Sequence, residues 1–316
     1  MFETLPADAQ TMMGWRWEQI APYYDALLAR EITAVSVTDW LADWTRLDNL
    51  VSEVYARLYL AHDLDTNNKE AEQRYFTFLE NVIPPVQTAD QALKDKLLQS
   101  EQSPEGMAVP LRNLREEAAL FREENIPLSI ELNKQSSQYQ KIVGGQTVMW
   151  EGKELPLPQL KPFYNDPDRA VRERAWRLAQ DRRLADRAAL NELWQEMLPL
   201  RRQIAANADC ADYREHAWRS FHRFDYTPTD AQAFHEAIAA VCVPAATRIY
   251  ERHRAQLGLT RLRPWDLSDG EWSRPVNPAD LQPLRPYQNS AEFLSKSIAL
   301  FQQVDTELGA HFQTMV

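Results

Sequence analysis

Apolar residues recur at helical spacing along most of the chain. Between residues 38 and 61 they occur every three or four positions, as in Trp40, Trp44 and Leu47, and residues 15–30 repeat the pattern. This spacing predicts two amphipathic helices that pair as an antiparallel hairpin. The expected fold is therefore mainly α: a multi-helix assembly of antiparallel helix hairpins.

Prolines and capping residues indicate where further helices begin and end. Proline lacks an amide hydrogen, whereas Asp, Asn and Thr side chains bond the free amides of a helix start. The first two of these predicted helices run from Asn68 to a break at Pro84-Pro85 and from near Pro110 to before Pro127. The next is one long helix from Asp166-Pro167 through Leu198. The last two run from Thr227-Pro228 to Gly258, with a kink at Pro244, and from Ser290 to Phe312. The Pro-rich stretch at residues 263–286 is expected to be an extended loop.

One segment departs from the helical pattern. Gly144-Gly145 and Glu151-Gly152 are turn signals on either side of the β-branched and aromatic run Thr147 to Trp150. This arrangement predicts one small antiparallel β-ribbon at about residues 140–157. With 8 glycines in 316 residues, well below the usual frequency of about 7 %, larger sheets are not expected. We divide the chain into an N-terminal helical domain, residues 1–126, and a helical region with the ribbon, residues 127–316.

The charge and composition restrict the partners. The formal net charge is −11, which repels phosphate groups, so nucleic acid and anionic membranes are not expected to bind. The sequence has no apolar run long enough to span a bilayer and no signal peptide at its acidic N-terminus, which favours the cytoplasm. Cys210 and Cys242 form no C-x-x-C motif and are expected to be reduced, partly buried thiols.

No complete metal or catalytic motif is present. A zinc hydrolase motif on a helix needs H-E-x-x-H, and His235-Glu236 begins it, but Ala239 stands where the second histidine ligand belongs. No histidine has a glutamate three positions before it, which excludes the di-iron bundle motif. We therefore assign no catalytic, no cofactor-binding and no metal-binding residue, and expect no cofactor in this chain.

A minor hypothesis places an unfamiliar hydrolase site among Glu215, His216 and His222. The two histidines are six positions apart, or about 240° around a continuous helix, so they cannot share one face of it. We expect them instead to pack or cap near Phe221 and Phe224.

Four segments together resemble the N-terminal region of oligoendopeptidase F, in the zinc oligopeptidase family that also contains thimet oligopeptidase. They are QYQKIVGGQTVMWEGKELPLPQL at residues 138–160, DPDRAVRERAWRL at 166–178, YREHAWRSFHRFDYTPTDAQAFHEAI at 213–238 and LGLTRLRPWDL at 257–267. The similarity runs along nearly the whole chain.

The resemblance implies a function that this chain cannot carry out alone. In that family the H-E-x-x-H motif, the further glutamate ligand and the histidine and tyrosine that bind the transition state lie in the C-terminal half, past the position of Val316. No catalytic residue can therefore be carried over, and zinc belongs to the full-length family. The resemblance implies the non-catalytic wall of a channel that admits short unstructured peptides, with Val316 near a domain junction.

Two functions remain open. The first is the N-terminal portion of an oligoendopeptidase F-like zinc metallopeptidase, inactive without its catalytic half. The alternative is a non-catalytic helical protein that binds peptides or a partner on the same scaffold. In either case an exposed apolar face is expected to bind the C-terminal half or a second copy. Its predicted contributors are Phe293, Leu294, Ile298 and Phe301 on the last helix, with Trp265 and Trp272.

Overall fold

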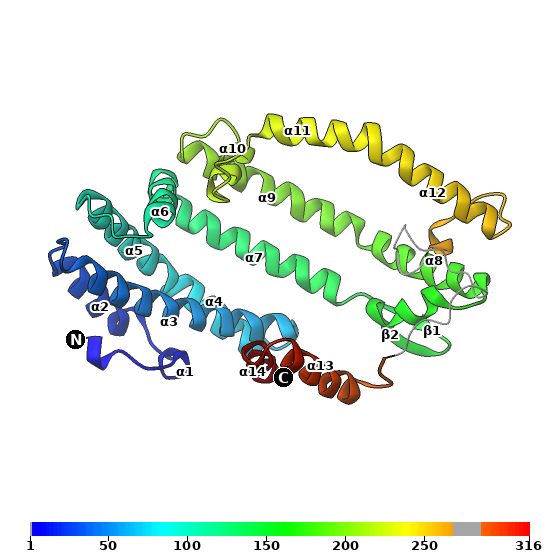
Figure 1. Ribbon diagram of the computed structural model, residues 1–316, viewed down its shortest axis with the longest axis horizontal. Coiled ribbons are helices and arrows are strands. Elements are labelled where there is room, and N and C mark those ends of the chain that lie inside the picture. Colours follow the sequence, from blue (N-terminus) through cyan, green and yellow to red (C-terminus); the bar gives the residue numbers. More distant parts are fainter. Residues whose placement is uncertain (1, 268–285) are drawn as a thin grey trace. The chain divides into compact units, whose positions relative to one another are not determined.

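The computed structural model describes residues 2–267 and 286–316, and within them the chain is mainly α-helical, as predicted (Figure 1). The described residues form fourteen α-helices and a two-stranded sheet: α1 Ala9–Met12, α2 Trp17–Ala29, α3 Val37–Leu64, α4 Lys69–Asn81, α5 Ile83–Gln99, α6 Ala108–Leu120, α7 Asn125–Gly144, β1 Thr147–Trp150, β2 Lys153–Pro156, α8 Arg169–Ala185, α9 Arg187–Asn207, α10 Tyr213–Ser220, α11 Pro228–Ala237, α12 Val243–Gln256, α13 Ser290–Val304 and α14 Thr306–Met315. Short 3₁₀ segments are η1 Phe2–Thr4, η2 Leu157–Asn165 and η4 Pro264–Asp266, and η3 Ile238–Cys242 is a π-helix.

Contacts within the chain define two compact units. Unit 1 comprises Met1–Pro162 with Arg174–Ala245, and unit 2 comprises Phe163–Glu173 with Ala246–Val316. The domain boundary that we place after residue 126 stays a prediction. The predicted loop at residues 263–286 lies largely outside the described residues, as does Trp272.

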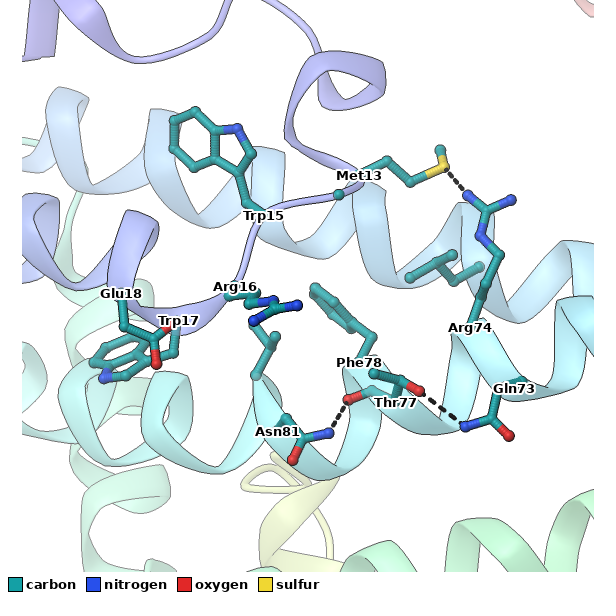
Figure 2. Close-up of a pocket in the computed structure, with 13 residues that line it drawn as sticks. Met13, Trp15, Arg16, Trp17, Glu18, Gln73, Arg74, Thr77, Phe78 and Asn81 are labelled. Carbon is teal, nitrogen blue, oxygen red and sulfur yellow. Dashed lines mark hydrogen bonds between the residues drawn. The ribbon is translucent and has the colours of Figure 1, made fainter.

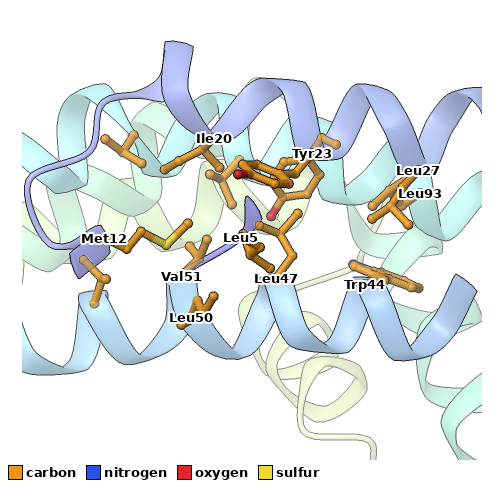
Figure 3. Packing of buried hydrophobic residues seen from close by; sticks show 14 of the residues in the cluster. Leu5, Met12, Ile20, Tyr23, Leu27, Trp44, Leu47, Leu50, Val51 and Leu93 are labelled. Atoms are coloured by element: carbon orange, nitrogen blue, oxygen red, sulfur yellow. The ribbon is translucent and has the colours of Figure 1, made fainter. Parts of the chain in front are cut away.

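The main hydrophobic core of unit 1 lies among α1 to α6. In α3, the buried residues recur every three or four positions, which places Trp40, Leu47 and Val54 on one face. Figure 3 shows this face against α2, with Ile20 toward Val51 and Leu27 toward Trp44, the order of an antiparallel hairpin. The predicted pairing of the first two long helices is therefore confirmed.

Helix starts in unit 1 follow the capping signals. The Asn68 side chain accepts hydrogen bonds from the amides of Glu70 and Ala71, both at 3.1 Å, and α4 begins directly after it. The break at Pro84 is confirmed, since α4 ends at Asn81 and α5 begins at Ile83. The sequence pattern does not indicate α5 or α7, because their apolar positions are interrupted by polar ones.

The predicted β-ribbon is present. Strands β1 and β2 pair antiparallel, with Trp150 opposite Lys153. Glu151 and Gly152 between them both have positive φ, 50° and 81°, which matches the two-residue hairpin turns that favour glycine. The guanidinium of Arg174, on α8, lies 3.9 Å from the centroid of the buried ring of Trp150, on β1. This contact attaches the ribbon to the following helix.

Two predicted helices are each divided in two, which corrects the sequence interpretation. The long helix predicted from Asp166 begins at Arg169 and is divided at Asp186, whose carboxylate accepts hydrogen bonds from Arg182 Nη1 at 2.7 Å and Gln146 Nε2 at 2.9 Å. The last predicted helix is divided at Asp305, which has extended backbone and caps α14 through the amides of Glu307 and Leu308. In both cases, the aspartate side chain accepts hydrogen bonds at the point where one helix ends and the next begins.

The segment around Pro244 combines a confirmed start with an irregular middle. Thr227 and Asp230 form the capping box that begins α11. The irregularity predicted at Pro244 takes the form of the π-helix η3, because proline has no amide to close the preceding turn. Cys242 in η3 is exposed, so its predicted partial burial is wrong, whereas Cys210 is buried.

Helices α13 and α14 approach closely at Gly309. A Cβ added there would lie 2.5 Å from Gln302 Cγ and 2.9 Å from Gln302 Cα. We expect Gly309→Ala to destabilise the α13–α14 pair by about 1–3 kcal/mol, because the backbone of Gln302 must move. Amide hydrogen exchange of residues 290–315 measures this loss.

The matched control for this substitution is Gly144→Ala at the end of α7. A Cβ there meets nothing within 4 Å. Alanine is favoured over glycine in helices by about 1 kcal/mol, so this variant should be unchanged or more stable. Equal protection of residues 290–315 in Gly309→Ala and the unmodified chain would contradict the close approach.

Candidate functional site

The incomplete zinc motif lies on an exposed helix. His235 and Glu236 are on the surface of α11, and Glu236 Oε1 accepts a 3.4 Å hydrogen bond from Gln232. Among residues 2–267 and 286–316, no group of three or more His, Cys, Asp or Glu side chains could hold a metal ion. Within the described chain, His235-Glu236 therefore has no partners for metal binding.

The residues of the minor hydrolase hypothesis do not form one site. Glu215 Oε2 accepts a hydrogen bond from the amide of Ala211 at 2.7 Å, so Glu215 serves the start of α10. His216 stacks on Tyr213, and burial lowers the pKa of its imidazole. Helix α10 ends before His222, which has a positive φ of 52° and stacks on Phe224 as predicted.

A cluster of charged groups lies between α5 and α6. Lys94 Nζ contacts Asp90 Oδ2 at 3.0 Å and Glu117 Oε2 at 2.7 Å. The Asp90 carboxylate also accepts a 2.8 Å hydrogen bond from Trp44 Nε1 on α3. His222 Nε2 lies 3.4 Å from the other oxygen of Glu117. The Lys94 ammonium group therefore joins α5 to α6. Its two carboxylate partners also contact Trp44 on α3 and His222 after α10.

The pKa directions follow from burial and the local charges. Burial opposes the charged form of Lys94, but the carboxylates of Asp90 and Glu117 outweigh it and raise the pKa of Lys94. Burial, and then the negative charge of Asp90, raise the pKa of Asp48. Lys94 is therefore protonated at neutral pH and cannot act there as a nucleophile or a general base.

A cavity of about 300 Å³ adjoins this cluster and is lined by Lys94, Glu117 and His216, among others. Its lining provides a cation held by two carboxylates and a neutral imidazole, but no nucleophile paired with a base. This arrangement stabilises the packing of α3, α5 and α6 without providing the groups for catalysis.

A larger cavity of about 670 Å³ lies between the segment before α2 and α4 (Figure 2). Its lining includes Trp15 and Arg16 from the segment, Trp17 at the start of α2, and Arg74 and Phe78 from α4. Sequence analysis did not identify this cavity. The alternation of two tryptophans with an arginine directly before a helix is the signal that could have indicated it.

Two of the motifs that carry the family resemblance meet in unit 2. Asp266, from the Leu-Arg-Pro-Trp-Asp segment, is fully buried and accepts hydrogen bonds from Arg169 Nε at 2.6 Å and Nη2 at 2.9 Å. The Arg172 guanidinium donates to the carbonyl oxygens of Trp265 and Asp166 at 2.9 and 2.8 Å. These motif residues therefore connect the start of α8 to η4 instead of forming a reactive centre.

Comparison with known families and curated proteins gives one match. The model of Peptidase family M3 matches residues 163–304 of this chain. No curated protein matches the sequence. Among the described residues, no helix is long and apolar enough to cross a membrane.

Solved structures share the fold of nearly the whole chain. An oligoendopeptidase F from Bacillus anthracis strain Ames superposes with a TM-score of 0.82 at 18% identity, over 94% of this chain and 54% of its own. PZ peptidase A with an inhibitor superposes with a TM-score of 0.84 at 21% identity, over 100% of this chain and 55% of its own. The chain thus spans about half the length of these proteins. The family match and the common fold confirm the resemblance that the sequence motifs indicated: residues 163–304 match Peptidase family M3, and nearly the whole chain has the fold of part of these oligoendopeptidase F-like structures.

Proposed function

We propose that this chain is the non-catalytic half of an oligoendopeptidase F-like metallopeptidase that hydrolyses short peptides in the cytoplasm. Three observations support this proposal: the family M3 match, the fold common with oligoendopeptidase F structures, and the coverage of about half their length. The two free cysteines fit a reducing compartment.

Family M3 is zinc-dependent in general, but the described residues do not fit a zinc ion. They contain no cluster of three ligand side chains, and Ala239 replaces the second histidine of the incomplete motif. We therefore assign the zinc and the chemical step to a second half, and derive no step from this chain.

The observation that carries the proposal is an uncovered apolar helix. Helices α11 and η3 contain no buried residue within the described chain. Phe234, Ile238 and Val241 follow one another at helical spacing, and Phe234 and Val241 are 65% and 68% exposed. A helix with an apolar stripe is stable in water when another element covers it. We assign the second half as that element.

This surface differs in part from the docking face expected from the sequence. Phe293 and Phe301 on α13 are exposed as expected, whereas Leu294 and Ile298 are half-buried. Trp265 is buried, because its ring packs beside the Arg169 guanidinium at 5.8 Å. It therefore offers no free apolar surface.

The first test is the natural protein purified from its source. We expect an intact mass greater than that of the 316-residue chain, one zinc per molecule by elemental analysis, and hydrolysis of a quenched fluorogenic peptide. The 316-residue chain alone should bind no stoichiometric zinc and hydrolyse no peptide. A natural mass equal to that of this chain would favour the non-catalytic binding protein instead.

The second test concerns the docking surface. Mixing this chain with the separately expressed second half should produce a complex by light scattering and restore peptidase activity. Phe234→Asp with Val241→Asp should weaken this association at least about tenfold, since a buried charge opposes docking. Val35→Asp, at a position 91% exposed, is the matched control and should associate normally. Self-association of the chain with no binding to the second half would contradict the assignment.

A further inference from the structure

The cavity between α4 and the segment before α2 is part of a longer groove. The 670 Å³ cavity and a neighbouring one of about 500 Å³ have Met13, Leu58 and Arg74 in common in their linings. The groove therefore follows α3 and α4, with Arg74 between its two parts. Its size and length suit a short extended chain better than a compact metabolite.

Two guanidinium groups in this groove have no carboxylate partner in the part of the chain that the structure describes. Among the described residues, neither Arg16 nor Arg74 lies within ion-pair distance of an acidic group, and Arg74 Nη2 contacts Met13 Sδ at 3.1 Å. Two carboxylates also line the groove, Glu18 in the larger cavity and Glu70 in the smaller one, but among the described residues neither pairs with Arg16 or Arg74. In contrast, Arg57 in the second part of the groove is paired with Glu53. In a chain of net charge −11, two unpaired guanidiniums in one cavity provide a local site for an anion.

Apolar side chains form another part of the lining and are held in place by aromatic contacts. Phe78 is buried at the base of the cavity. Trp15 stacks on Tyr23 with ring centroids 6.1 Å apart, and Trp17 lies 5.8 Å from Tyr24. Figure 2 shows Arg16 and Arg74 on either side of Phe78. The groove therefore places apolar walls next to its positive groups.

Polar side chains line one edge of the same cavity. Gln73 donates a hydrogen bond to Thr77 Oγ1 at 3.2 Å, and Asn81 Nδ2 donates to the Thr77 carbonyl oxygen at 2.9 Å. The Asn81 Oδ1 atom keeps its capacity to accept a hydrogen bond from a backbone amide. This edge distinguishes a peptide from a fatty acid, because a hydrocarbon chain would leave these polar groups unpaired.

We propose that this groove binds the C-terminal end of a short peptide. Arg16 and Arg74 attract the terminal carboxylate, Trp15 and Phe78 contact an apolar last side chain, and Asn81 accepts from the peptide backbone. The proposal does not require the peptidase role, because a peptide-binding groove suits either function considered for this scaffold.

The test compares a free carboxylate with an amide. The probe is Ala-Ala-Ala-Leu with fluorescein on its N-terminus, prepared as the free acid and as the C-terminal amide, with binding followed by fluorescence anisotropy. We expect the acid to bind about tenfold more tightly, because a charge-assisted hydrogen bond contributes about that much to affinity. Increasing salt should reduce this difference.

Substitutions in the groove locate the site. Arg16→Gln and Arg74→Gln, alone and together, should reduce the affinity for the acid toward that for the amide and leave the affinity for the amide unchanged. Both positions are exposed, so folding should be retained, as circular dichroism will verify. Arg115→Gln, an exposed arginine of α6 outside the groove, is the control and should bind the acid normally.

Three results would overturn the proposal. The first is equal binding of the acid and the amide. The second is unchanged acid binding in the double variant. The third is complete displacement of the peptide by dodecanoate at a lower concentration than unlabelled Ala-Ala-Ala-Leu, which would assign the groove to a fatty acid.

Discussion

Replacement of Asp266 by alanine is expected to lower the stability of the α8 to η4 connection in unit 2 by about 3–5 kcal/mol. The Asp266 carboxylate is fully buried, accepts two hydrogen bonds from Arg169, and accepts a third from the Arg263 amide at 2.8 Å. Arg172, whose side chain is 5% exposed, lies 3.8 Å from it. Removal of the carboxylate would leave this buried guanidinium without a compensating charge.

Amide hydrogen exchange of residues 163–173 and 246–267 measures this loss locally, which avoids assuming that both units unfold together. Asp266→Asn keeps the shape and an acceptor without the charge, so it should give an intermediate loss. The control is Asp209→Asn, which removes a carboxylate that is 85% exposed and pairs with Arg122 at 2.8 Å, at a position of positive φ that asparagine tolerates. Such an exposed pair contributes under about 1 kcal/mol. Equal protection in Asp266→Ala and Asp209→Asn would show that the buried cluster does not stabilise unit 2.

This cluster explains why a family resemblance could be inferred before any site. Arg169 and Arg172 lie in one segment and Asp266 in another about 100 positions later in the sequence, and the structure brings them into one cluster around the buried Asp266 carboxylate. Buried ion pairs fix the residue types at each position, so such segments keep a readable pattern. The pattern therefore indicates the scaffold and gives no information on catalysis.

The fold could be predicted where a local signal determines it. The β-ribbon, the Asn68 cap of α4 and the capping box of Thr227 and Asp230 each depend on a few adjacent residues. The divisions at Asp186 and Asp305 could not be predicted. Aspartate is tolerated on a helix surface as well as at a cap, and its side chain partner decides between the two.

The candidate sites depend on contacts that the sequence does not display. Lys94 and Glu117 lie on different helices, and the groove joins the segment around Trp15 to α4 across about 60 positions. Helical spacing gives the face of each residue but not which faces meet. The surroundings of His222 could be predicted more readily than these sites, because His222 stacks on Phe224, which is close to it in the sequence.

Replacement of Lys94 by methionine is expected to lower the free energy of unfolding of unit 1 by about 2–3 kcal/mol. Methionine keeps most of the apolar stem but removes the charge that lies 3.0 Å from Asp90 and 2.7 Å from Glu117. Asp48 adds a third carboxylate to this region, and its pKa is already raised by burial and by Asp90. The remaining negative charges would therefore repel one another, and urea denaturation measures the loss.

The pH dependence distinguishes lost charge from lost packing. In the unmodified chain the raised pKa of Lys94 means that its contribution is fully present below pH 10.5 and is lost only as the pH rises above that value. In Lys94→Met, the uncompensated carboxylates should have raised pKa values in the folded state. The folded variant then binds more protons than the unfolded chain, so its deficit in stability should shrink as the pH falls from 7 toward 4.

Lys134→Met is the matched control, because Lys134 forms a surface pair with Glu80 in which both side chains are more than a third exposed. Its loss should stay under about 1 kcal/mol and change little between pH 7 and pH 4. A deficit in Lys94→Met that is the same at both pH values would mean that shape alone causes it. The ammonium of Lys94 would then fill space between α5 and α6 without holding the two helices through its charge.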